Sequence, residues 1–399
     1  MKKIIYISYV LTLIALFLYS YTQIDLSLTF SRIEVLRNLV KSFQYIGYFN
    51  RPLSTFIYIL LLLLLSNLYL GFLTLAYTRQ ISKKTIWKLI IAGAVILAFS
   101  YNAFSYDLFN YMFDAKIITH YHQNPYLFKA LDFPGDSMLS FMHWTHRTYP
   151  YGPVWLALTV PLSFIGFNLF IPTFVLFKLL AAASFLGTAY YIGKILEKIT
   201  PQHASLGIIF FALNPLVLIE SLVSGHIDIV MLFFVIWSLY KIINKKYLSA
   251  LILLAISIGI KFTTAVLLPV FILITIMQLK NKKINWEILF FTAIILMVIP
   301  VIYASRLSNY QPWYLLEVIV FASLLPHKYF VFLPTAIISL FALLTYAPFL
   351  YLGNWNPPVP QFLSNLYSLS YSISLFGVVS YYLYKRKLKS QNVKRKITT

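Results

Sequence analysis

The chain contains twelve apolar stretches of about 15 to 25 residues, the range in which a helix can cross a lipid bilayer. Leu, Ile, Phe and Tyr fill these stretches without the alternating pattern of a membrane barrel, so helices are expected to span the bilayer. We therefore predict an all-α polytopic membrane protein with about 12 transmembrane helices. The predicted spans are 4–22, 53–77, 88–105, 172–194, 204–222, 229–243, 247–260, 263–279, 286–303, 313–326, 330–350 and 364–384.

The composition excludes other classes of protein. Only 11% of the residues are charged and 60% are hydrophobic, whereas a soluble domain has about a quarter charged residues. Without any cysteine, the chain has no disulfide framework, zinc–cysteine site or cysteine nucleophile. The net charge of +21 does not indicate nucleic-acid binding, because the basic residues form short clusters between apolar stretches.

The distribution of charge predicts the orientation. If 151–167 is a helix that lies in the interface or re-enters from it, the strongly basic connections all fall on one side, which is the cytoplasmic side by the positive-inside rule. Both termini are then cytoplasmic and 106–150 is a large outer loop. Of the 11 acidic residues, only Glu197 and Glu287 fall inside. This asymmetry indicates a chemical site that faces outward.

The outer loop opens with a candidate catalytic helix. If 107–114 is helical, Asp107, Asn110, Tyr111 and Asp114 share one face. Two carboxylates at the membrane surface suit a general base with a supporting acid or cation ligand, and burial near lipid favours proton acceptance. The alternative is a solvated helix whose polar face meets water.

Other polar motifs are predicted to lie at the same face. Residues 143–153 mix Arg147, Tyr149 and Tyr151 with two histidines; the rings suit sugar and the guanidinium suits phosphate, although an interfacial aromatic belt has a similar composition. His226 and Asp228 follow Gly225 in a turn that is either a ligand site or an ordinary connection.

Two further segments supply cations and rings to this face. Lys261 lies between two short apolar stretches, 247–260 and 263–279. Its side chain is expected either to extend to the membrane surface or to bind an anion such as a lipid phosphate. The second segment contains the candidate binding residues Arg306, Gln311, Trp313 and Tyr314. Lys178, within a span, is predicted to pair with Glu220 or Glu317. That these features converge on one face of the membrane is stronger evidence for a functional site there than any single motif.

The order of these motifs over 88–330 resembles the GT-C fold glycosyltransferases, particularly the mannosyltransferases that use polyprenyl-phosphate mannose. The motifs are Tyr106-Asp107 through Tyr111, Asn124-Pro125-Tyr126, Tyr149-Pro150-Tyr151-Gly152-Pro153, Gly225-His226-Ile227-Asp228, Lys261-Phe262-Thr263 and Gln311-Pro312-Trp313-Tyr314. Ile227 stands where the family pattern has Asn, and Glu317 is an unfamiliar acid after the Pro-Trp-Tyr element.

The resemblance implies an inverting transfer of a hexose, with mannose expected, from a polyprenyl-phosphate donor to a glycan, lipid or protein acceptor on the extracytoplasmic face of the cell membrane. It implies Asp107 as the general base and Asp114 as the second candidate. A divalent cation such as Mg or Mn stays open as a cofactor. The expected organisation is two N-terminal spans in 1–87, a catalytic module in 88–330 with its outer loop at 106–170, and C-terminal spans with a basic tail in 331–399.

Two other functions remain open. A transporter or flippase for lipid-linked sugars also needs cations and rings within the membrane, but it favours repeat symmetry, and the sequence shows no repeat. The other is a non-catalytic scaffold of an envelope assembly complex.

Overall fold

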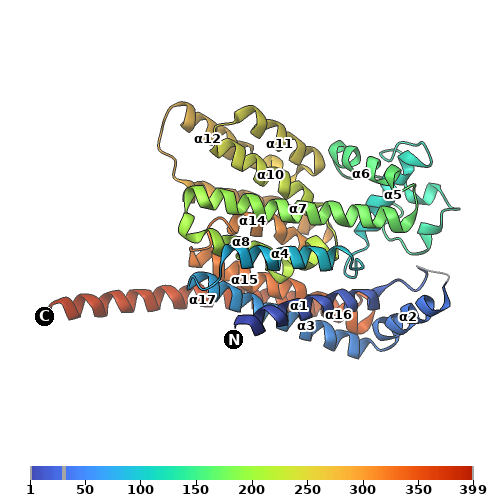
Figure 1. The fold of residues 1–399 in the computed structure, drawn as a ribbon, viewed down its shortest axis with the longest axis horizontal. Helices are drawn as coiled ribbons and strands as arrows, with labels where there is room; N and C mark the ends of the chain where they lie inside the picture. Colours follow the sequence, from blue (N-terminus) through green and yellow to red (C-terminus); the bar gives the residue numbers. More distant parts are fainter. Residues whose placement is uncertain (1, 29–32, 398–399) are drawn as a thin grey trace.

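The computed structural model describes residues 2–28 and 33–397, and these ranges contain helices and loops but no strand. Figure 1 shows the helices gathered into one elongated bundle. The α-helices are α1 (Lys2–Ser20), α2 (Glu34–Gln44), α3 (Arg51–Tyr77), α4 (Lys83–Ala98), α5 (Asp107–Thr119), α6 (Pro153–Ile165), α7 (Phe170–Ile199), α8 (Ala204–Ala212), α9 (Pro215–Leu218), α10 (Asp228–Ile243), α11 (Tyr247–Ile260), α12 (Leu268–Leu279), α13 (Trp286–Ser308), α14 (Leu316–Ala322), α15 (Tyr329–Leu344), α16 (Tyr346–Leu352) and α17 (Val359–Ile397).

Seven of the predicted spans coincide with helices that are long and apolar enough to cross a membrane, which confirms the polytopic class. Within the described residues these helices are Lys2–Gln23, Arg51–Tyr77, Phe170–Ile199, Phe262–Leu279, Trp286–Leu307, Tyr329–Leu352 and Val359–Lys387. The predicted span 204–222 is a bent pair of helices, which makes an eighth crossing if the pair counts as one. The other four predicted spans correspond to the shorter helices α4, α10, α11 and α14. The count of twelve is therefore not confirmed.

The basic connections that the charge pattern groups together do lie at one end of the bundle. Contacts join them in a chain: Lys2 to the Gln80 carbonyl, Lys83 to Glu197, Lys198 to Asn244, and Glu287 to Lys328. Both ends of the chain also lie toward this end, whereas α2, α5 and α6 lie toward the opposite one (Figure 1). The sequence analysis did not predict α2.

The bent pair in the core carries polar residues into the bundle. α8 ends before Asn214, whose side chain accepts a hydrogen bond from the Leu216 amide at 2.9 Å and so starts α9, with Pro215 in its first turn. The segments Pro201–Ala212 and Pro215–Val223 are bent by 53°. A π-helical turn, η6 (Ile219–Val223), follows α9. The break directs the polar segment 220–228 toward the end of the bundle that carries α5.

The predicted outer loop, 106–150, is anchored by apolar packing. In α5, Leu108, Phe109, Met112 and Phe113 are buried, so that the helix is fixed on one side and leaves Asp107 partly exposed. The segment 151–167, predicted to lie in the interface or re-enter from it, contains the helix α6, which has 13 residues and is shorter than a span; its place relative to the membrane stays a prediction. Just before α6, the Gly152 amide donates to the Ile260 carbonyl at 3.1 Å, which places this end of the loop beside Lys261.

Candidate active site

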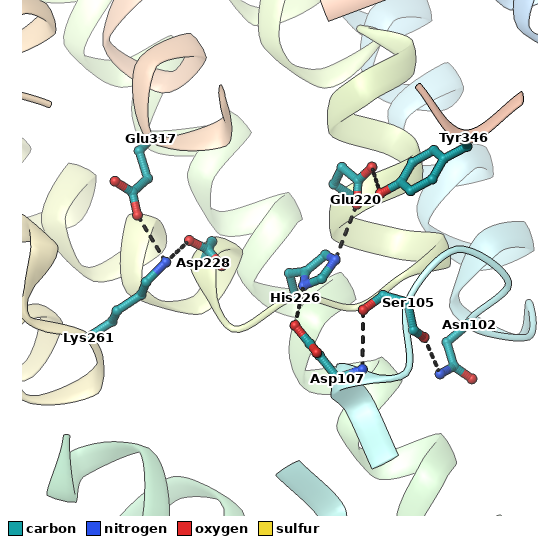
Figure 2. Close-up of polar contacts among 9 residues, drawn as sticks. All are labelled: Asn102, Ser105, Asp107, Glu220, His226, Asp228, Lys261, Glu317 and Tyr346. Atoms are coloured by element: carbon teal, nitrogen blue, oxygen red, sulfur yellow. Dashed lines mark hydrogen bonds and ion pairs between the residues drawn. The ribbon is translucent and has the colours of Figure 1, made fainter. Parts of the chain in front are cut away.

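Asp107 stands at the first position of α5, where the helix dipole favours a negative charge. A tight turn holds it there: the Asn102 side chain donates to the Ser105 carbonyl at 2.8 Å, and Ser105 Oγ accepts from the Asp107 amide at 3.2 Å (Figure 2). The Asp107 side chain remains 18% exposed. Burial raises the pKa of Asp107, and the nearby His226 and Arg147 partly oppose this effect. The carboxylate is therefore accessible and poised to accept a proton.

His226 lies between two carboxylates. Its Nδ1 is 3.7 Å from Asp107 Oδ2, and its Nε2 is 3.2 Å from Glu220 Oε2 (Figure 2). The other oxygen of Glu220 accepts a hydrogen bond from the Tyr346 hydroxyl at 2.9 Å. The side chains of His226 and Glu220 are fully buried. In this conformation His226 cannot contact a sugar, so its expected binding role stays a prediction without support from the geometry.

Lys261 forms a second charged cluster with two carboxylates. Its Nζ lies 2.6 Å from Asp228 Oδ1 and 3.1 Å from Glu317 Oε1, and 5.5 Å from the centre of the Tyr314 ring. The lysine side chain is 18% exposed, whereas both carboxylates are buried. The three residues come from α10, from the end of α11 and from α14, so the cluster joins distant parts of the sequence. Lys261 and Asp228 also lie within electrostatic range of Asp107.

The turn that carries His226 is held by Lys178, and the predicted pairing of this lysine with Glu220 or Glu317 is wrong. Its ammonium donates to the carbonyls of Leu222 and Val223, and to Ser100 Oγ at 3.2 Å. The π-helical turn and the break after it leave these carbonyls without a following helical turn, so a buried lysine can satisfy its charge on them.

Gly225 gives this turn its shape, because its φ of +70° lies in the left-handed region. We expect Gly225→Ala to lower the free energy of unfolding by about 1–2 kcal/mol, which is the usual cost of an L-residue in that region. Chemical denaturation of the detergent-solubilised protein measures this loss. Gly71→Ala is the matched control: Gly71 lies inside α3, and a Cβ there meets nothing within 4 Å. An equal effect of the two substitutions would contradict the assignment of strain to Gly225.

Aromatic rings line the same region. Trp313 stacks on His226 at 4.1 Å between ring centres, and Tyr314 follows it in the short helix η8 (Pro312–Leu315). Tyr111, predicted on the polar face of α5, is buried and contacts Tyr151 edge to face at 5.5 Å. Tyr151, Trp313 and Tyr314 are half-buried and offer rings of the kind that bind sugar faces, whereas Tyr111 is buried and packs behind them.

Arg147 and Asp114 lie on the outer side of this site. The exposed guanidinium of Arg147 lies over the Trp144 ring at 4.3 Å, within electrostatic range of Asp107 and Asp114. Burial raises the pKa of Asp114 to about 8, although Arg147 opposes the shift. Asp114 therefore holds its proton at neutral pH, which makes it a weaker candidate base than Asp107.

Three predicted site residues lie outside the charged clusters. Tyr149 is buried, and its hydroxyl donates to the Gly152 carbonyl at 2.7 Å, which gives it a role in shaping the loop. Gln311 is half-buried at the start of η8. Arg306 is exposed in the last turn of α13 and makes none of the contacts described above.

The sequence analysis missed Glu220, Glu317 and Tyr346 as members of the site. Two of them had a usable signal, because an acid inside an apolar stretch is rare unless it is paired or functional. Tyr346 had none, since tyrosine occurs throughout this chain. Within the described residues, no group of three or more His, Asp or Glu side chains is arranged to hold a metal ion.

Comparison with known proteins places the chain in a family. The sequence model of the alpha-(1->6)-mannopyranosyltransferase N-terminal domain matches residues 26–277, which is more than half of the chain. The match includes Asp107, Glu220, His226, Asp228 and Lys261, while Trp313, Glu317 and Tyr346 complete the site from beyond it. No curated protein and no solved structure matches the chain. By this match, the chain belongs to the alpha-(1->6)-mannopyranosyltransferase family.

Proposed function

We propose that this membrane protein is a GT-C type transferase that moves mannose from a polyprenyl-phosphate donor to a glycan, lipid or protein acceptor, with inversion at the anomeric carbon. The family supports the transfer of mannose. The observation that carries the remainder is the position of Asp107: its partly exposed carboxylate stands beside two charged clusters and a set of aromatic rings.

The chemistry required of the protein is limited. The acceptor hydroxyl attacks the anomeric carbon, the bond from this carbon to the phosphate oxygen breaks, and polyprenyl phosphate leaves with the electron pair. Asp107 takes the proton of the hydroxyl as the new bond forms. Because the phosphate is already a good leaving group, the protein has only to orient the two substrates, accept the proton and stabilise the developing charge.

Two cations support binding of the donor phosphate. Arg147 is exposed and lies near Asp107, and its planar guanidinium suits a phosphate. The ammonium of Lys261 is partly exposed but already contacts Asp228 and Glu317. Arg147 is therefore the better placed of the two for the first contact, and Lys261 provides positive charge deeper in the site.

We also propose that the site faces outward. The basic connections gather at one end of the bundle, which the positive-inside rule assigns to the cytoplasm together with both termini. Asp107 and the outer loop belong to the opposite end. The four shorter helices would complete a path of twelve crossings. The proposed catalytic module, 88–330, contains both charged clusters, and Tyr346 reaches it from the C-terminal part.

Direct assay of the purified protein tests the proposal. The protein, reconstituted in lipid vesicles, is given polyprenyl-phosphate mannose and a mannoside acceptor, and we expect a new α-linked mannose from the β-linked donor. Loss of a mannose from the envelope glycans of a strain without the protein would identify the acceptor. Movement of the lipid-linked sugar across the vesicle membrane without a new glycosidic bond would instead identify a transporter. Repeating the assay with a chelator decides whether a divalent cation takes part.

A further inference from the structure

Glu220 makes buried polar contacts, although the proposed transfer reaction assigns it no role. It is fully buried, in η6, and both of its oxygens face polar groups of other segments: Oε1 accepts from the Tyr346 hydroxyl, and Oε2 faces His226. A buried carboxylate is costly unless it is paired, so its placement needs a physical reason. The imidazole beside it supplies one.

Each ring nitrogen of His226 lies within ion-pair distance of a carboxylate (Figure 2), although neither makes a hydrogen bond to the described residues. A neutral imidazole carries a proton on only one of its two nitrogens. The lone pair of the other nitrogen would then face the lone pairs of a carboxylate, which is repulsive. Only the imidazolium carries a proton on both nitrogens and is attracted to Asp107 and Glu220 at once. An imidazolium at this position is therefore attracted by a carboxylate on each side.

The surroundings hold this ring in place. Trp313 stacks on one face of the ring, and the His226 amide donates to the Glu220 carbonyl at 3.1 Å, which closes the turn between the two residues. Lys178 fixes the intervening carbonyls of Leu222 and Val223. The position of Glu220 relative to His226 is thus set by the backbone and not by a flexible side chain alone.

We propose that Glu220 is a positioning residue that keeps His226 protonated as the counter-ion of Asp107, so that the base stays ionised in a buried site. This inference rests on the proposed function, in which Asp107 accepts the proton of the acceptor. Glu220 touches neither substrate, and it acts on the reaction through the charge of His226.

The direction of the effect follows from the charges. Asp107 works as a base only when it is ionised, so activity falls as the pH drops through its pKa. Burial raises the pKa of Asp107 and the positive His226 opposes this, so a loss of charge on His226 raises the pKa further. Other charged or titratable groups also lie near His226, Glu220 and Asp107. They are Tyr58, Tyr111, His143, Arg147, Tyr151, Asp228, Lys261, Tyr310 and Tyr346.

The experiment compares Glu220→Gln with the wild type in kcat/KM for mannose transfer from polyprenyl-phosphate mannose. Gln keeps the shape of the side chain but removes its charge. We expect the acidic limb of the pH profile to move to higher pH by about one unit. The kcat/KM of the variant is then roughly tenfold below that of the wild type at the acidic end, and much closer to it at the alkaline end. Glu220→Asp, which restores a carboxylate, is expected to recover part of the shift.

Two further variants separate charge from packing. His226→Gln is expected to move the same limb in the same direction, and the double variant is expected to add little, because both changes remove one interaction. Glu287→Gln is the matched control: this glutamate faces His327 at 2.9 Å at the opposite end of the bundle, and its loss is expected to leave the pH profile unchanged.

The outcomes are distinguishable. A wild-type pH profile in Glu220→Gln overturns the inference, and so does an equal loss at every pH, which is the signature of a packing role. The inference can fail in either way while Asp107→Asn is inactive, and the proposed function then stands. Full activity of Asp107→Asn would overturn the assignment of Asp107 as the base, and the inference with it. The proposed function itself fails only if the wild-type protein forms no new mannosidic bond.

Discussion

Asp107→Asn is expected to lower the rate of mannose transfer by about 10²–10⁴-fold, which is the usual contribution of a positioned general base. The amide has nearly the shape of the carboxylate but cannot accept the proton of the acceptor hydroxyl. Because Asp107 is partly exposed and its backbone amide, not its carboxylate, is bound by Ser105, the substitution leaves the turn before α5 intact. Binding of the donor is expected to change far less than kcat.

The measurement is single-turnover transfer by the purified variant, with thermal unfolding as the check on the fold. Asp132→Asn is the matched control, since Asp132 is an exposed aspartate of the same loop and its side chain accepts from the Lys129 amide, a contact that Asn can keep. We expect this control to retain full activity. Asp114→Asn tests the second candidate base. Because its pKa of about 8 keeps Asp114 protonated at neutral pH, we expect this substitution to lower the rate of mannose transfer far less than Asp107→Asn does. The reverse order would assign the base to Asp114.

Much of this architecture could be predicted from the sequence, because its signals are local. Apolar length marks seven segments that form helices long and apolar enough to cross a membrane, and the helical spacing of the polar residues in 107–114 fits the helix α5. The charge pattern correctly groups the basic connections at one end of the bundle. These are properties of single segments, or sums over many loops, and they need no knowledge of how the helices pack.

The partners within the site could not be predicted, because they depend on packing between distant segments. Lys178 was expected to find an acid, but the break after Val223 offers it backbone carbonyls that no sequence pattern reveals. Likewise, the two carboxylates around Lys261 come from α10 and α14, and their distance from it depends on the crossing of these helices. The π-helical turn that turns Glu220 toward His226 has no sequence signature either.

The cluster around Lys261 leads to the second large effect, on stability. Asp228 and Glu317 are buried, and Lys261 is the cation that contacts both of them. Removing one partner of a buried ion pair leaves an uncompensated charge and typically costs 3–5 kcal/mol. We therefore expect Lys261→Met to lower the free energy of unfolding by about 3–5 kcal/mol, or to raise the protonation of one carboxylate until part of this cost is relieved.

A double substitution tests that explanation. If the cost arises from the unpaired carboxylates, adding Glu317→Gln to Lys261→Met removes one buried charge and is expected to recover a substantial part of the lost stability, as measured by denaturation in detergent. If the cost arises from the lost contacts of the lysine chain, the second substitution gives no recovery. Lys261→Arg then separates stability from donor binding, because it keeps the charge but changes the geometry of the donor groups. We expect this variant to fold and to raise the KM for the lipid-linked donor several-fold more than the KM for the acceptor; unchanged donor kinetics would remove Lys261 from the phosphate site and leave Arg147 as the cation to test.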